Sequence, residues 1–171
     1  METGYYSRVA RWLHWGMALL IIGNLAGGLL HDIAPQQIMP VHKANGILLL
    51  GLAIVRIGWR LTHKAPAWPE SMSRGARRLS SLAHASLYGL MVLIPLSGWI
   101  MSSASDRPIS FFGLFDVPKF AVTKEDMVAG ISYEAHEILA FVMIALLVLH
   151  IAAALRHHFI LKDGIMARML G

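Results

Sequence analysis

The chain contains no cysteine among its 171 residues. Disulfide bonds, thiolate-bound iron–sulfur clusters and cysteine-based zinc sites are therefore excluded. Charge is also scarce, because only 15% of the residues are Asp, Glu, Lys or Arg, against about 25% in a typical soluble domain. A water-soluble fold of this length needs more polar surface, so the low charge favours a lipid bilayer as the solvent.

Apolar residues make up 56% of the chain, and its mean hydropathy is +0.57. They are concentrated in four stretches, and a helix needs about 20 residues to cross the hydrocarbon core. We therefore predict an all-α fold, a four-helix transmembrane bundle in one domain over residues 1–171, with helices at about 9–31, 42–62, 79–104 and 134–158. Arg56 and Arg60, at the far end of the second stretch, are expected to snorkel to the headgroups.

The distribution of lysine and arginine predicts the orientation of the bundle. These residues gather before the first stretch, between the second and third, and after the fourth: Arg8, Arg11, Arg60, Lys64, Arg74, Arg77, Arg78, Arg156, Lys162 and Arg168. The positive-inside rule then predicts that both termini are cytoplasmic. Because the basic residues flank apolar spans, the net charge of +5 indicates a membrane surface and no nucleic-acid partner.

The predicted outer loop, from about residue 106 to 133, is the longest connection and contains four large apolar side chains: Phe111, Phe112, Leu114 and Phe115. Two interpretations stand. The segment dips into the headgroup region, where such side chains are stable, or it forms a docking or substrate-entry surface.

Nine histidines are present, and several fall inside the apolar stretches. His136 and His150 are fourteen residues apart, nearly four helical turns, so both rings project from almost the same face, roughly 21 Å apart along the axis. His42 is predicted at the depth of His136, and either His14 or His84 at the depth of His150.

Paired imidazoles at two depths predict two haems, each with its iron between two rings, which leaves no open position on the iron and suits electron transfer. Zinc is disfavoured because it prefers ligands that lie close together. No CxxCH sequence is present, so haem b is expected rather than covalently attached haem. A non-redox membrane protein that moves protons or ions through its histidines is the alternative.

Four segments of the chain carry a resemblance to a known family: "YSRVARWLHW", "PVHKANGI", "LAHASLYGLMVLIPLSGWIM" and "AHEILAFVMIALLVLHIAAALRHHF". Over nearly its full length the chain resembles the bacterial cytochrome b561 family, which includes superoxide oxidase. The resemblance implies that His14 and His150 hold an inner haem and that His42 and His136 hold an outer haem. It also implies a ubiquinone site near the cytoplasmic face with His84 and His157, whose imidazoles titrate near neutral pH and can relay protons.

The function implied by the resemblance is electron transfer across a bacterial inner membrane, from superoxide outside to ubiquinone, by a superoxide:ubiquinone oxidoreductase. Lys43, Lys119 and Lys124 are candidates to steer the superoxide anion, since local positive potential raises association rates. The alternative is a quinol-linked cytochrome b subunit that serves a periplasmic redox protein. Membrane lipid is a partner in either case.

Overall fold

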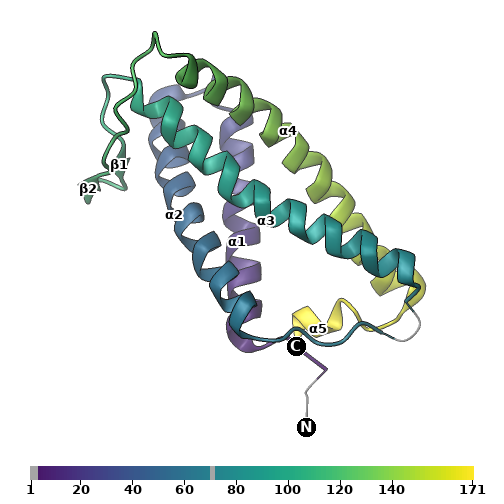
Figure 1. Cartoon of the computed structure of the whole chain (residues 1–171). Helices are drawn as coiled ribbons and strands as arrows, with labels where there is room; N and C mark the ends of the chain where they lie inside the picture. The colour runs from purple at the N-terminus through teal and green to yellow at the C-terminus, as the bar shows by residue number, and fades with distance from the viewer. Residues whose placement is uncertain (1–3, 70–71) are drawn as a thin grey trace.

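The computed structural model of the chain describes residues 4–69 and 72–171 and is mainly helical (Figure 1). Its elements are α1 (Arg8–Leu29), α2 (Pro35–Thr62), α3 (Arg74–Ser103), β1 (Ser110–Phe111), β2 (Phe115–Asp116), α4 (Met127–Leu155), the π-helix η1 (Arg156–Leu161) and α5 (Ala167–Leu170). Helices α1, α2, α3 and the continuous α4–η1 segment are each long and apolar enough to cross a membrane. The predicted fold class is therefore confirmed.

Three of the long helices begin five to seven residues before the predicted position, at Pro35, Arg74 and Met127. The hydrocarbon layer limits the apolar run but not the helix, which continues into the headgroup region as long as its end is capped. Proline is well suited to the first turn of α2, where its missing N–H has no helical partner. At the start of α3, the Ser73 hydroxyl accepts the backbone N–H of Ala76 at 3.2 Å, which satisfies one free donor.

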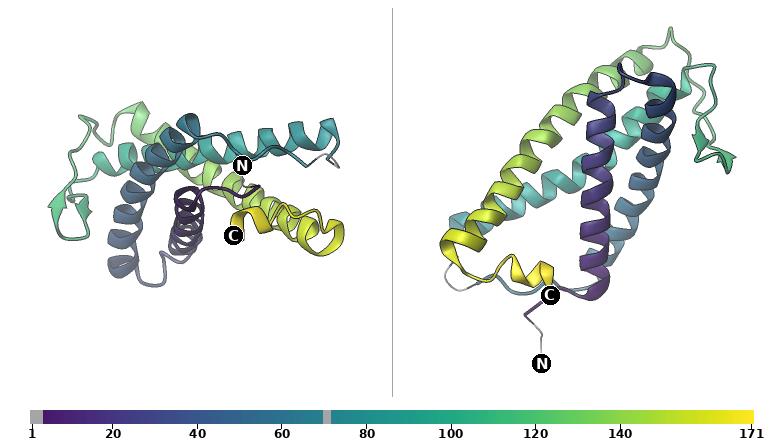
Figure 2. Two further views of the ribbon diagram at one scale, coloured as in Figure 1. Left: turned by 90° about the horizontal axis from the view of Figure 1, so that it is seen from below. Right: turned by 180° about the vertical axis from the view of Figure 1, so that it is seen from behind.

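The four long helices form two pairs, α1 with α2 and α3 with α4, and the pairs meet mainly where α2 packs on α3. The pairs converge at the end that carries the β-hairpin and diverge toward the end that carries both termini (Figure 1, Figure 2). The terminal segments touch there: the Tyr6 N–H donates to the Arg168 carbonyl at 3.1 Å, and the Trp15 indole donates to the Met169 carbonyl at 3.0 Å. Both termini thus lie at one face, and its cytoplasmic location remains a prediction.

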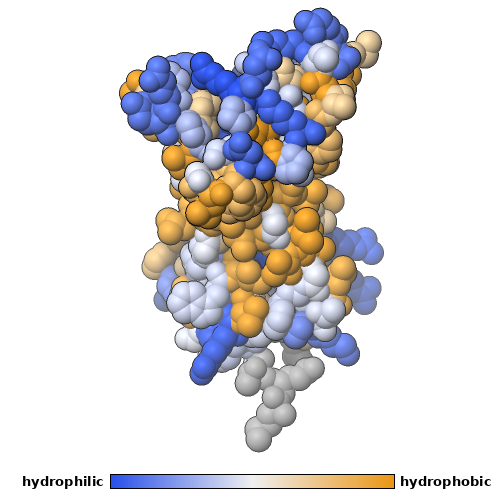
Figure 3. Space-filling model, turned by 90° about the vertical axis from the view of Figure 1, so that its left-hand side faces the viewer, coloured by the Kyte–Doolittle hydropathy of each residue, from blue (hydrophilic) through white to orange (hydrophobic). Residues whose placement is uncertain are grey.

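On the face drawn in Figure 3, apolar side chains form a band across the middle of the bundle, with polar side chains gathered above and below it. Large apolar side chains of the long helices, such as Leu19, Ile54 and Val148, are exposed. So much exposed apolar surface is unstable in water but stable against lipid tails. The chain is accordingly a multi-pass membrane protein.

The loop between α3 and α4 carries a short antiparallel hairpin in which Phe111 pairs with Phe115. Ile109 and Val117, at the base of the hairpin, are buried, whereas Leu114 at the tip is 77% exposed. The turn requires positive φ at Phe112 and Gly113. The hairpin is therefore anchored at its base and projects from the bundle (Figure 1), which is compatible with both sequence-based interpretations.

Candidate functional site

The bundle brings His42 of α2 and His136 of α4 together at the end nearer the hairpin, and we call this pair the outer tier. Their ring centroids are 6.1 Å apart. An imidazole nitrogen binds a transition metal at about 2 Å, and the ring centre lies about 1 Å beyond it, so two rings on opposite sides of one metal have centroids about 6 Å apart. The outer tier has the spacing of two axial ligands.

Backbone carbonyls determine which nitrogen of each outer-tier ring is free. Nδ1 of His42 lies 3.0 Å from the carbonyl oxygen of Asn24, and Nδ1 of His136 lies 2.9 Å from that of Ile94. A carbonyl only accepts, so each Nδ1 carries the proton and donates it, and each Nε2 keeps its lone pair. Metal-binding histidines are commonly held in this way.

Two glycines make room for the outer-tier rings. A Cβ on Gly98 of α3 would lie 2.8 Å from Cε1 of His136, and a Cβ on Gly28 of α1 would lie 3.2 Å from Cε1 of His42. Any larger residue at position 98 must displace the imidazole. The two rings therefore lie close against the backbones of α1 and α3, and glycine at positions 28 and 98 allows this close approach.

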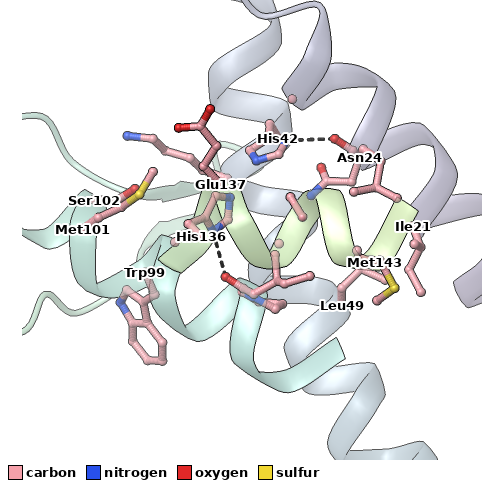
Figure 4. Close-up of a pocket in the computed structure, with 18 of the residues that line it drawn as sticks. Ile21, Asn24, His42, Leu49, Trp99, Met101, Ser102, His136, Glu137 and Met143 are labelled. Carbon is pink, nitrogen blue, oxygen red and sulfur yellow. Dashed lines mark hydrogen bonds between the residues drawn. The ribbon is translucent and has the colours of Figure 1, made fainter. Parts of the chain in front are cut away.

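A cavity of about 400 Å³ adjoins the outer tier (Figure 4). Its walls are largely apolar and include Ile21, Leu49 and Met143. Asn24 also lines it, and its side-chain oxygen is buried without a hydrogen-bond partner among the described residues. A flat apolar macrocycle with a few polar substituents fits such a cavity, and the free Nε2 atoms and the room left by the two glycines fit its iron and axial ligands.

At the opposite end of the bundle, His14 of α1, His84 of α3 and His150 of α4 gather, and we call this group the inner tier. The centroids of His14 and His150 are 6.3 Å apart, and those of His84 and His150 are 5.5 Å apart. The first distance matches two axial ligands of one metal as well as the outer tier does. The second is shorter, so His84 lies beside the pair.

The inner tier differs from the outer tier in its hydrogen bonds. Nδ1 of His14 lies 3.1 Å from Nη2 of Arg56, and Nε of Arg56 donates to the hydroxyl of Tyr88 at 3.2 Å. Arg56 was expected to snorkel to the headgroups. Instead it turns into the bundle, where it contacts the ring nitrogen of His14 and the phenol oxygen of Tyr88.

A larger cavity, of about 890 Å³, opens beside the inner tier. Its lining includes His84, Arg56, Tyr88 and Trp59. Among the described residues that line it there is no carboxylate. The cavity thus combines aromatic walls with hydrogen-bond donors, which suits a flat ligand that carries carbonyl oxygens.

His157, predicted to act with His84, is not among the described lining residues of that cavity. It lies in η1, and its Nδ1 is 2.5 Å from a carboxylate oxygen of Asp163, with both side chains largely buried. Burial acts to raise the pKa of Asp163, but hydrogen bonds from His157 and from the Ile165 N–H outweigh it and lower the pKa. The pair links η1 to the turn that follows it.

The three predicted steering lysines occupy different surroundings. Lys43 lines the outer cavity, whereas Lys119 donates to the carbonyl of Ser105. Lys124 lies 3.6 Å from the Asp106 carboxylate, and both are exposed. Arg107, which sequence reasoning did not single out, acts electrostatically on Lys43 together with Lys119. Its only signal in the sequence was its position at the start of the outer loop.

Among the described residues, no three or more His, Asp or Glu side chains gather where they could hold a metal ion.

The family model described as "Prokaryotic cytochrome b561" matches residues 5–171 of the chain. "Cytochrome b561 homolog 2" of Escherichia coli is 34% identical over 97% of this chain and 91% of its own length. "Probable superoxide oxidase CybB" of Yersinia pestis is 28% identical over 96% of this chain and 95% of its own length. "Cytochrome b562" of Cereibacter sphaeroides is 26% identical over 99% of this chain and 96% of its own length.

Proposed function

The chain belongs to the prokaryotic cytochrome b561 family, and we propose that its two histidine tiers hold two b haems through which electrons pass from the outer face to ubiquinone. Membership of the family implies electron transfer in the bacterial inner membrane with b-type haem. The number of haems, their ligands and the electron donor are our proposal.

The proposed axial ligands are His42 with His136 in the outer tier and His14 with His150 in the inner tier. The single observation that carries this assignment is the pair of centroid distances, 6.1 and 6.3 Å, which fit one iron between each pair of rings. When bound, a haem with two histidine ligands supplies a one-electron carrier without an open position for substrate. The substrates therefore meet the edges of the sites, where the two cavities open.

Superoxide is the proposed electron donor, in line with the name of the Yersinia relative. Two superoxide anions each lose one electron and leave as O₂, and one ubiquinone gains both electrons together with two protons and leaves as ubiquinol. The anion would be drawn to the outer cavity by Lys43 and Lys119. Lys124 would contribute less, since Asp106 is paired with it.

Ubiquinone is proposed to bind in the cavity beside the inner tier, where His84 can hydrogen-bond a carbonyl of the ring. Reduction of that carbonyl requires protons, and an imidazole at the cavity wall can deliver them. His157 would not contact the quinone directly, because its ring is hydrogen-bonded to Asp163. It would act as part of the proton path.

Stopped-flow mixing of the oxidised, haem-loaded protein with superoxide tests the proposal. Haem reduction on mixing, followed by ubiquinol formation, is expected. Lys43→Gln should slow the reduction and weaken its dependence on ionic strength, because steering by exposed charge is screened by salt. Lys124→Gln is the matched control and should have a smaller effect. A protein that carries haem but is not reduced by superoxide would contradict this donor.

A second candidate is a quinol-linked cytochrome b that serves a periplasmic redox protein. The projecting hairpin supports it, because Phe112, Leu114 and Phe115 are all exposed at its tip. In that case ubiquinol, and not superoxide, would reduce the haems. Leu114→Asp would then block electron exchange with the partner while leaving reduction by quinol intact.

A further inference from the structure

Arg56 is a cation held inside a membrane-spanning helix. Its guanidinium is fixed by the contact with Nδ1 of His14 at 3.1 Å and by the hydrogen bond to the Tyr88 hydroxyl at 3.2 Å. Its Cζ also lies 5.7 Å from the centre of the Tyr88 ring. A charge retained in a membrane span is costly, and such groups usually serve function. The location behind a proposed haem ligand indicates what that function is.

The groups in direct contact with the proposed ligand rings differ in sign between the two tiers, while Lys43 also acts electrostatically on His42 from the next position on α2. Behind His42 and His136 lie carbonyl oxygens, the negative ends of peptide dipoles. Behind His14 lies a full positive charge, and Arg56 also acts electrostatically on His150 and His84. In this part of the bundle the charge is poorly screened, since buried charges interact more strongly than exposed ones.

These differences act in the same direction on reduction. An acceptor on the ring N–H makes a histidine a more basic ligand, which favours the oxidised iron of the outer tier. Reduction adds one negative charge, so a nearby cation favours the reduced state of the inner tier. Hydrogen bonds and charges around the ligands are among the factors that set the potential of a haem.

We propose that Arg56 is a positioning residue that raises the reduction potential of the inner tier above that of the outer tier. Electrons are thereby drawn from the outer face toward the cavity that contains His84. The inference rests on the proposed two-haem function. Tyr88 acts through Arg56, by holding the guanidinium behind His14.

The test is a redox titration, followed by visible spectra, of the purified haem-loaded protein. Arg56→Gln should shift the one-electron equilibrium of the inner tier toward the oxidised form about tenfold, or about 59 mV, and leave the outer tier unchanged. Arg56→Lys, which keeps the charge, should shift it much less. Arg78→Gln removes the same charge from an exposed site on α3 and should move neither step. The His136→Ala background, expected to retain the inner haem alone, assigns the step.

An inner step that stays in place in Arg56→Gln, or that moves together with the outer step, would overturn the inference. So would a rise of the inner potential, which is the result expected if Arg56 stabilises a deprotonated His14 ring. If Arg56→Gln does not retain the inner haem, Tyr88→Phe releases the cation while keeping its charge. Tyr88→Phe should lower the reduction potential of the inner tier by less than is expected for Arg56→Gln. An unchanged potential would contradict the inference. Wild-type protein with fewer than two haems would contradict the proposed function instead.

Discussion

The outer and inner tiers have nearly the same ring spacing but are built in different ways. In the outer tier both rings are fixed by carbonyls, and Gly28 and Gly98 let them lie close against the backbone. In the inner tier a third histidine lies beside the pair, an arginine takes the place of a carbonyl, and the adjoining cavity is about 890 Å³ against about 400 Å³. Under the proposed function, the outer tier would hold a haem, and the inner tier would hold a haem and pass its electrons to a quinone.

The largest expected effect comes from removing one ring of either pair. His136→Ala should lose the outer haem and keep the inner one, because a single imidazole no longer holds the iron from both sides. His14→Ala should lose the inner haem and keep the outer one. The haem-to-protein ratio and the spectrum of the reduced protein measure both results. Equal loss of both haems in each variant would show that the tiers are not independent, and the assigned pairs would be wrong.

Sequence reasoning anticipated the coarse form of this arrangement, because helix length and histidine spacing follow from the chain alone. Fourteen residues between His136 and His150 already predict one ring near each face. The spacing could not choose between His14 and His84 as the partner of His150, and the structure brings both close to it.

Other features depend on packing between helices that are distant in sequence. The inward turn of Arg56 required knowing that Tyr88 and His14 face it. The carbonyls of Asn24 and Ile94 carry no residue-specific signal, since every residue has one. Likewise, Asp163 follows His157 by six residues, and only the turn after η1 brings the two side chains together.

A smaller effect is expected from Gly98→Ala, which tests whether the outer tier depends on the close approach of the His136 ring to Gly98. The added methyl would lie 2.8 Å from Cε1 of His136, and overpacking of this kind costs about 1–3 kcal/mol. We expect weaker haem binding in the outer tier, by about 10- to 100-fold as for other changes that misorient a ligand. Haem titration of the depleted protein measures it.

Gly51→Ala is the control for this substitution, because no atom lies within 4 Å of a Cβ at that position. It should leave haem binding unchanged, since alanine is also the better helix former. Equal binding in the two variants would mean that His136 tolerates displacement, and the contrast between a rigid outer tier and an open inner tier would be lost.

His84→Ala tests whether the third histidine of the inner tier serves the quinone rather than the iron. Both haems should be retained, and the KM for ubiquinone should rise about tenfold, which corresponds to the loss of one hydrogen bond of about 1 kcal/mol or slightly more. Steady-state quinone reduction and the visible spectrum are the measurements. His158→Ala, at an exposed position near the same face, should not change KM. Loss of the inner haem in His84→Ala would assign His84 to the iron.

The smallest effect concerns two carboxylates that flank the α4–η1 segment, Asp126 before it and Asp163 after it. Asp163, beyond the inner end, accepts from His157 at 2.5 Å, and its hydrogen bonds outweigh burial and lower its pKa. A lowered folded-state pKa gives stability that is complete above the unfolded value of about 3.9 and is lost as the pH falls through the folded value. Asp163→Asn should therefore destabilise the C-terminal turn at neutral pH by about 1 kcal/mol or less, and it should abolish the acid-side loss below about pH 4.

Asp126, at the outer end, accepts the backbone N–H of Thr123 at 2.6 Å and the Thr123 hydroxyl at 3.0 Å, and the backbone bond is the main cause of its lowered pKa. It is fully exposed to solvent, so Asp126→Asn should have a still smaller effect, with loss at the same acid side. Hydrogen exchange of the two segments, compared at pH 7 and below pH 4, measures both. Water screens the exposed Asp126–Thr123 interaction more than the buried His157–Asp163 pair, so the loss of protection should be larger at Asp163. A larger loss at Asp126 would mean that burial of the His157–Asp163 pair adds no stability.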